Sequence, residues 1–150
     1  MNVWCGVLGN RSIGPFVFDS NLTGNTYETF LRNELPGLLE DMIRSQMYFQ
    51  HDGAPPHYTR HVREYLNEFF PNRMLGRGGP VAWPPRSPYL TPLDYYLWAH
   101  MKTYETKVES NAALRDRIFI AAEHIRKHPD KVASATQSLL MRAENRIATG

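Results

Sequence analysis

The sequence has 150 residues, 42% of them hydrophobic, which is enough to build the core of a single domain. Seventeen basic and 15 acidic side chains leave a formal net charge of +2, so the charge of the whole chain does not indicate a nucleic-acid partner. A single cysteine excludes an internal disulfide and a cysteine-based zinc site. With no signal-peptide pattern and no apolar run of about 18 residues, we expect a soluble intracellular protein without a membrane partner.

The first two elements form a predicted β-hairpin. Strand patterns at residues 2–9 and 13–18 flank a tight turn at Gly9 and Asn10, residue types that suit hairpin turns. Cys5 lies in the first of these patterns, where we expect it to pack as a small hydrophobic side chain.

A helix is predicted next, over residues 25–45. Its apolar residues recur at helical spacing: Tyr27, Phe30, Leu31, Leu35, Leu38, Leu39 and Met42. Asn25 and Glu28 are spaced like a capping box at its start. We expect Pro36 and Gly37 to kink or split this helix.

The middle of the chain alternates strand, helix and loop. A short buried strand is predicted at 47–51, followed by a helix at 57–70. Residues 72–92 are rich in glycine and proline and read as a long loop, which suggests a functional role. A short strand near 73–75 or 81–83 could lie within that loop.

The remainder of the chain is predicted to be helical. Helical spacing resumes near Leu93, and two further helices are separated by Pro129. Their apolar positions are, in order, Leu93, Tyr96, Leu97, Met101 and Tyr104; Leu114, Ile118, Ala121, Ala122 and Ile125; and Val132, Ala135, Leu139, Leu140, Ala143 and Ile147. The order β-β-α-β-α-(β)-α-α-α indicates an α/β domain with a helical C-terminal extension.

Two aspartates lie where active-site side chains are often presented. Asp52 directly follows the predicted strand, and Asp94 begins a helix just after the Pro-rich loop. Two such carboxylates can share Mg²⁺ and support phosphoryl transfer. Structural roles remain open on spacing alone, because Asp52-Gly53 is a common turn pair and aspartate suits a helix start.

Two longer stretches carry a family resemblance. "HDGAPPHYTRHVREYL" (51–66) and "WPPRSPYLTPLDYYLW" (83–98) resemble the second and third catalytic-aspartate motifs of mariner-type transposases. The likeness also includes "VWCGVLGNRSIGPFVF", "NELPGLLED" and "GRGGPVAWPPRSP", so it covers essentially the whole chain.

The resemblance implies a ribonuclease-H-like catalytic core of the DDE/D superfamily, which cleaves and joins DNA with Mg²⁺ or Mn²⁺ in the nucleus. It implies that Asp52 and Asp94 are catalytic residues and metal ligands. By the same resemblance, residues 1–106 form the core and 107–150 its helical extension. DNA is the implied partner, and a homo-oligomer is a further possibility.

Weaker candidates lie close to the two motifs. His57 matches the histidine that follows the family's aspartate, and we expect it to orient a carboxylate or contact substrate. Arg77 and Arg86 lie in the Pro-rich loop, where they either pair with DNA phosphates or stay solvated. A zinc site at His51, His57 and His61 is less favoured because no HExxH-type signature accompanies them, although 57 and 61 are spaced for one helix face.

The sequence departs from the family pattern in two ways. The family's first catalytic aspartate, carried by an initial strand, has no counterpart in these 150 residues, and Tyr89 replaces the aspartate of the family's SPDL motif. We therefore expect a core that lacks its first strand and the helix-turn-helix modules that read transposon ends. The chain would be a transposase-derived fragment that is inactive on its own, or an incomplete gene model.

A non-enzymatic role is the alternative. From Asn111 onward the chain has seven basic and four acidic side chains. This weakly basic extension, together with the Pro-rich loop, could bind nucleic acid or protein, and Arg126, Lys127 and Lys131 are the residues that would test it.

Overall fold

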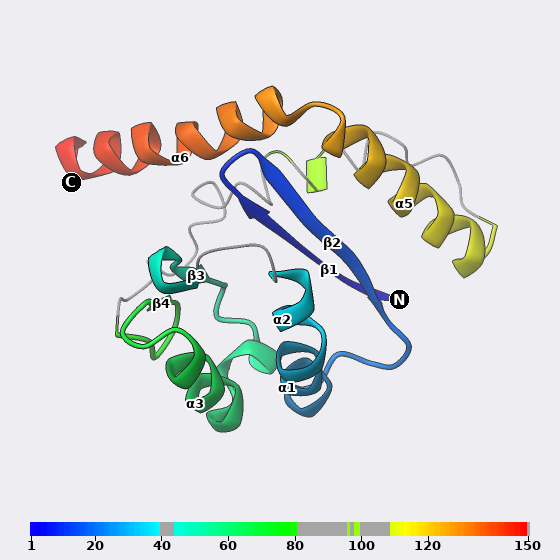
Figure 1. Ribbon diagram of the computed structural model, residues 1–150, viewed down its shortest axis with the longest axis horizontal. Coiled ribbons are helices and arrows are strands. Elements are labelled where there is room, and N and C mark those ends of the chain that lie inside the picture. The colour runs from blue at the N-terminus through cyan, green and yellow to red at the C-terminus, as the bar shows by residue number, and fades with distance from the viewer. Residues whose placement is uncertain (40–43, 81–95, 97, 100–108, 150) are drawn as a thin grey trace. The chain divides into compact units, whose positions relative to one another are not determined.

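The computed structural model describes residues 1–39, 44–80, 96, 98–99 and 109–149, and Figure 1 shows its elements. The chain divides into two compact units. The first consists mainly of Val3–Val17 and Arg86–Gly150, and the second of Phe18–Pro85.

The first unit is built on the predicted hairpin, which the structure confirms. Strands β1 (Asn2–Leu8) and β2 (Arg11–Phe18) pair in a two-stranded sheet. The turn between them places Gly9 at φ +59°, a left-handed conformation that costs glycine little because it has no Cβ. The local turn chemistry therefore sets this hairpin.

Helices α5 (Asn111–Arg126) and α6 (Pro129–Thr149) also belong to the first unit. Helix α5 begins after Ser110, whose hydroxyl accepts a hydrogen bond from the Ala113 N–H at 3.1 Å, and α6 follows it (Figure 1). Both agree with the predicted helices. The helix expected from Leu93 falls largely outside the described residues.

The core of the first unit joins one face of the hairpin to the two helices. Cys5, Ile125 and Val132 are buried together at its centre, and partly buried Val3, Val7, Tyr96 and Trp98 pack against them. Residues 3, 5 and 7 share one face because side chains alternate along a strand. The thiol of Cys5 is the expected small hydrophobic group, and burial raises its pKa to about 12.

Polar contacts fasten the helices to the hairpin as well. The Thr136 hydroxyl donates to the carbonyl of Gly9 at 2.8 Å. The Arg126 guanidinium donates to the carbonyl of Gly14 and also pairs with Glu123. Arg126 is therefore a structural residue of this unit, which weakens the expectation that it is available to an external polyanion.

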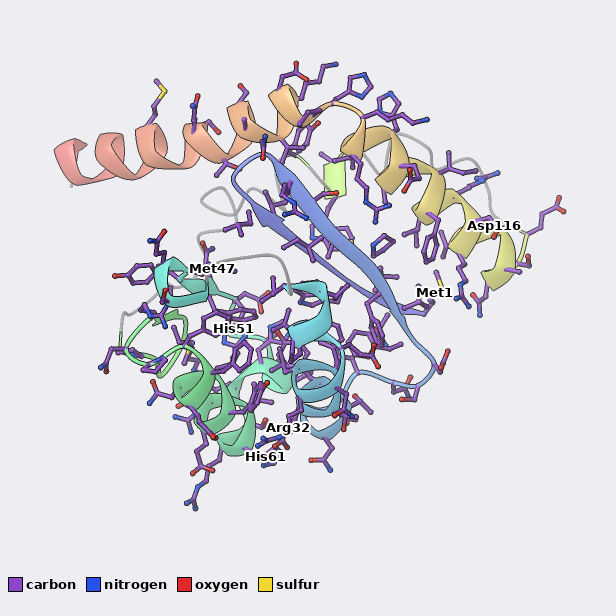
Figure 2. The ribbon with its side chains drawn as sticks, viewed as in Figure 1. Met1, Arg32, Met47, His51, His61 and Asp116 are labelled. Carbon is purple, nitrogen blue, oxygen red and sulfur yellow. The ribbon has the colours of Figure 1, made fainter. Side chains whose placement is uncertain are left out.

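The second unit combines short helices with a very small sheet. Its elements are α1 (Gly24–Asn33), α2 (Leu35–Leu38), a 3₁₀ turn at Arg44–Gln46, β3 (Phe49–Gln50), a second 3₁₀ turn at Pro55–Tyr58, α3 (Arg60–Phe69) and β4 (Met74–Leu75). Helix α1 packs on α3 and on the 3₁₀ turn that precedes it. Fully buried side chains fill the space between them: Tyr27, Leu31, Leu35, Val62, Leu66, Phe70 and Met74. His51 is the buried polar residue among the described residues (Figure 2).

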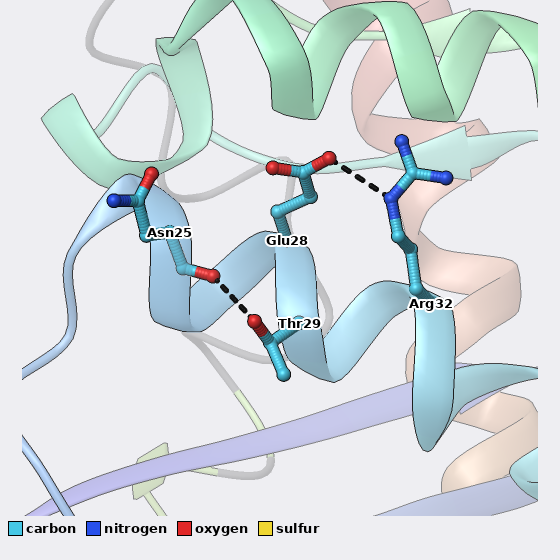
Figure 3. Close-up of polar contacts among 4 residues, drawn as sticks. All are labelled: Asn25, Glu28, Thr29 and Arg32. Carbon is cyan, nitrogen blue, oxygen red and sulfur yellow. Dashed lines mark hydrogen bonds and ion pairs between the residues drawn. The ribbon is translucent and has the colours of Figure 1, made fainter.

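The capping box predicted at Asn25 and Glu28 is wrong, because Thr23 and Thr26 form the cap of α1. Thr23 is the N-cap: its hydroxyl accepts from the Thr26 N–H at 3.2 Å, and the Thr26 hydroxyl oxygen accepts from the Thr23 N–H at 2.8 Å. Because the helix begins at Gly24, Asn25 lies inside the first turn, where its carbonyl accepts from the Thr29 hydroxyl at 2.9 Å. Glu28 pairs instead with Arg32 at 2.9 Å (Figure 3). The predicted split near Pro36 is confirmed, since α1 ends at Asn33 and α2 begins at Leu35.

The strand predicted at 47–51 is shorter than expected. Phe49 and Gln50 pair in parallel with Met74 and Leu75, and the His51 N–H extends the ladder to the Leu75 carbonyl at 3.2 Å. The strand ends where its partner ends, because an unpaired extended backbone gains no ladder hydrogen bonds. The suggested strand near 73–75 is therefore present, and residues 81–83 lie outside the described residues.

Helix α3 also begins later than predicted. The two prolines form a 3₁₀ turn in which the Ala54 carbonyl accepts from the His57 N–H at 2.9 Å, and Thr59 then adopts an extended conformation before Arg60 starts the helix. His57 and His61 consequently belong to different elements. The prediction that they share one helix face, on which the zinc hypothesis depended, is wrong.

The α/β class predicted from the sequence agrees with this element order. No helix within the described ranges combines the length and the apolar character that a membrane crossing requires. The boundary expected at residues 106 and 107 stays a prediction.

Candidate active site

The candidate site lies at the carboxyl ends of two parallel strands. Asp52 follows β3 after one residue, and Arg77 follows β4 after one residue. Because the strands are parallel, their carboxyl ends meet at the same edge of the sheet, where α/β folds commonly place their ligands. The stem of Arg77 lies against Gly53: a Cβ on that glycine would be 3.2 Å from Cδ of Arg77.

Asp52 presents an ordered, ionised carboxylate. Its Oδ1 accepts a hydrogen bond from the Ala54 N–H at 3.0 Å and lies 2.6 Å from Nδ1 of His57. The hydrogen bond from His57 is the main reason that the pKa of Asp52 falls from 3.8 to about 2. Partial burial raises this pKa, and the hydrogen bond from the Ala54 N–H lowers it. An ionised carboxylate only accepts hydrogen bonds, so Nδ1 of His57 carries the shared proton.

The second oxygen of Asp52 is not used by the described part of the chain. Both contacts go to Oδ1, and the side chain is 69% exposed. Oδ2 can therefore accept a ligand from solvent without breaking an existing contact.

His57 is held in place by aromatic packing. Its ring lies 4.5 Å from that of Tyr27 and stacks on His51 at 5.1 Å, with 10° between the planes. His51 beneath it is a neutral ring, because burial, helped by the neighbouring His57, lowers its pKa to about 3. This stack fixes the imidazole that orients Asp52.

Gly76 gives His51 the room it needs. A Cβ at position 76 would lie 2.8 Å from Cδ2 of the buried ring, closer than such atoms approach. The first glycine of the "GRGG" stretch is thus required by packing under the site.

Arg77 and Arg63 both contact the ring of Tyr58. The guanidinium carbon of Arg77 lies 4.1 Å from the ring centroid of Tyr58, and that of Arg63 lies 4.6 Å from the same centroid. Sequence analysis missed Arg63, because its position on α3 gave no sign that it would meet a tyrosine from the preceding 3₁₀ turn.

Part of the predicted site cannot be placed. Asp94 and Arg86 lie outside the described residues. Within the described ranges, no group of three or more His, Cys, Asp or Glu side chains could hold a metal ion. Asp52 would therefore need partners from elsewhere to complete a metal site.

Comparison with known proteins identifies a similar fold. No protein-family model matches the chain, and no curated protein does either. A solved structure of the Mos1 transposase catalytic domain, with raltegravir and Mn, superposes with a TM-score of 0.55 over 92% of this chain and 80% of that one, at 18% sequence identity. The chain therefore has a fold similar to that of a transposase catalytic domain.

Proposed function

We propose that the chain is a transposase-type catalytic core of ribonuclease-H-like architecture, in which Asp52 and Asp94 hold Mg²⁺ or Mn²⁺ for phosphoryl transfer on DNA. The observation that carries the proposal is the state of Asp52: its carboxylate is ionised and held through Oδ1, and its side chain is largely exposed just beyond a strand end. DNA as substrate implies action in the nucleus.

The surroundings of Asp52 fit a ligand to a hard cation. Mg²⁺ and Mn²⁺ prefer carboxylate oxygens, and a ligating carboxylate is commonly steadied by hydrogen bonds to its other atoms. Here the Ala54 N–H and His57 supply that support. A bound divalent ion at such a site activates water and neutralises charge on the phosphate.

The protein's own residues have defined parts in this scheme. His57 keeps the Asp52 carboxylate in one orientation, and the stack with His51 and Tyr27 keeps the imidazole from turning away. Asp52 stays charged throughout the physiological pH range, so metal binding there does not require the loss of a proton.

The proposal extends to a limit on activity. These 150 residues contain two of the three acids that the transposase resemblance calls for. We therefore expect this polypeptide to bind divalent metal weakly and not to cleave DNA on its own.

Calorimetric titration with Mn²⁺ tests the metal site. Asp52→Asn and Asp94→Asn should each weaken binding about tenfold or more, because even the hydrogen-bonding partners of metal ligands typically contribute that much. Asp19→Asn is the matched control, because Asp19 is an exposed aspartate that directly follows a strand, β2, and it should leave binding unchanged. Equal Mn²⁺ affinity in wild type and Asp52→Asn would refute the proposed site.

A nicking assay on supercoiled DNA tests the limit on activity. With Mg²⁺ or Mn²⁺ the chain should produce no nicked circles. Strong nicking that Asp52→Asn abolishes would show that the two aspartates suffice, and the expectation of inactivity would be wrong.

A further inference from the structure

We propose that Tyr58, Arg63 and Arg77 form a binding site for a phosphate of the DNA backbone, beside Asp52. This inference deepens the proposed function and rests on it for the identity of the substrate. The three residues are called the arginine–tyrosine site below.

The first support is the gathering of two cations on one ring. The guanidinium carbons of Arg77 and Arg63 lie 4.1 Å and 4.6 Å from the Tyr58 centroid. Each cation–π contact is worth about 0.5–1 kcal/mol at an exposed site. Two like charges beside one ring repel each other, and an anion between or beside them removes that repulsion.

The second support is that neither guanidinium has an anionic partner in the described part of the chain. Two other arginines of this unit do: Arg32 pairs with Glu28 at 2.9 Å and Arg60 with Glu64 at 2.7 Å. Arg63 is half-buried, yet its Nε has no hydrogen-bond acceptor in the described structure. Its position is set by the ring rather than by an ion pair.

The third support is the glycine turn that closes against this site. Gly78 has φ +74°, and a Cβ there would lie 2.9 Å from Cε2 of Tyr58 and 3.0 Å from Nη1 of Arg63. The turn is stabilised by the Gly79 N–H, which donates to the Gly76 carbonyl at 3.1 Å. Backbone this close to Tyr58 and Arg63 limits the movement of both side chains and pre-orders the Arg63 guanidinium.

The chemistry of the site suits a phosphodiester. Guanidinium groups present planar pairs of N–H donors that match phosphate oxygens, and stacking on an aromatic ring fixes that plane. Arg77 lies against Gly53, directly after Asp52, so a phosphate bound there would be adjacent to the proposed metal ligand. A backbone phosphate next to the reacting one is the ligand that fits this position.

Salt dependence of DNA binding tests the inference. Anisotropy of a short fluorescein-labelled duplex is measured with EDTA present, over a range of salt concentrations. Each phosphate contact contributes about 0.9 to the slope of log K against log salt. Because both arginines contact the same phosphate, Arg77→Gln and Arg63→Gln should each reduce the slope measurably, by up to that amount. Arg77→Lys should keep most of the slope while weakening binding, because lysine retains the charge without the planar fork.

Arg60→Gln is the matched control, since Arg60 is an exposed arginine of the same helix that already pairs with Glu64, and its slope should equal that of wild type. Arg77 is exposed, so its variants should fold normally and can decide the question even if Arg63→Gln unfolds. Competition with inorganic phosphate separates a site for any phosphate from a site that needs the DNA strand. If inorganic phosphate displaces the duplex from wild type only at concentrations that also displace it from Arg77→Gln, the site needs the DNA strand.

The outcomes separate this inference from the proposed function. Unchanged slopes in both arginine variants, a slope lost only on neutralising Lys127 and Lys131, or no duplex binding at all would overturn the arginine–tyrosine site. If the slopes fall as expected while Asp52→Asn keeps full Mn²⁺ affinity, the phosphate site stands and the metal chemistry fails. If the slopes stay unchanged while Asp52→Asn loses Mn²⁺ affinity, the metal site stands and this phosphate contact does not.

Discussion

Replacing His57 with phenylalanine tests the origin of the charge state of Asp52. The variant His57→Phe keeps a ring for the stack with Tyr27 and His51 and removes the Nδ1–H that lies 2.6 Å from the carboxylate. The pKa of Asp52 should rise from about 2 to near 3.8, because the partial burial and the Ala54 hydrogen bond that remain act in opposite directions.

The same contact contributes to stability in a defined pH window. A change in pKa of this size corresponds to at most about 2.5 kcal/mol. Because the Asp52 side chain is 69% exposed, solvent screening reduces the expected contribution to about 1 kcal/mol. The pKa is lowered on folding, so this stability is present above pH 3.8 and is lost as the pH falls through about 2.

Carboxyl ¹³C NMR titration measures the pKa, and urea unfolding at several pH values measures the stability. His61→Phe is the control, because His61 is exposed on α3, and it should leave the Asp52 titration unchanged. If Asp52 still titrates near pH 2 in His57→Phe, the hydrogen bond is not the cause of the lowered pKa. The account of how the carboxylate is held would then be wrong.

Three further predictions concern packing. Gly76→Ala should lower the free energy of unfolding by about 1–3 kcal/mol, because the added Cβ would lie 2.8 Å from the buried ring of His51; urea denaturation measures this. Ile125→Ala should cost about 2–5 kcal/mol because Ile125 is fully buried, whereas Ile120→Ala, on the same helix but 63% exposed, should change stability by about 0.5 kcal/mol or less. The buried thiol of Cys5, with its pKa raised to about 12, should resist Ellman's reagent at pH 8 until urea unfolds the chain.

Each packing prediction has a clear contrary result. Gly37→Ala meets no atom within 4 Å, so a loss of stability equal to that of Gly76→Ala would show that crowding is not the cause. Equal losses at Ile125 and Ile120 would contradict the assigned core. Rapid labelling of Cys5 without urea would mean that the hairpin opens readily from its helices.

Elements governed by nearby residues were predictable from the sequence. The hairpin depends on a turn at Gly9, and the helical positions of Ile125 and Val132 follow from apolar spacing within one helix. Both kinds of signal are local, so a single sequence carries them. The predicted N-cap of α1 was wrong by two residues, because Thr23 caps as well as Asn25 could and spacing does not choose between them.

The site was predictable only in part, because its geometry depends on distant pairing. Asp52 was found from its place after an apolar segment, but the length of β3 is set by β4, whose residues come more than 20 positions later. That pairing also brings Arg77 beside Gly53. Arg63 could be recognised only once the 3₁₀ turn had placed Tyr58 in contact with both guanidinium groups.

The bonds from α5 and α6 to the hairpin have a consequence for biosynthesis. The carbonyl of Gly14 bonds to Arg126, 112 residues later in the chain, and that of Gly9 bonds to Thr136, 127 residues later. At ribosomal rates the nascent hairpin therefore spends roughly ten seconds without its covering helices. An isolated two-stranded ribbon is only marginally stable, and contacts between residues so far apart in the chain form slowly. During that interval the apolar face of the hairpin that carries Cys5 is exposed to chaperones or to aggregation.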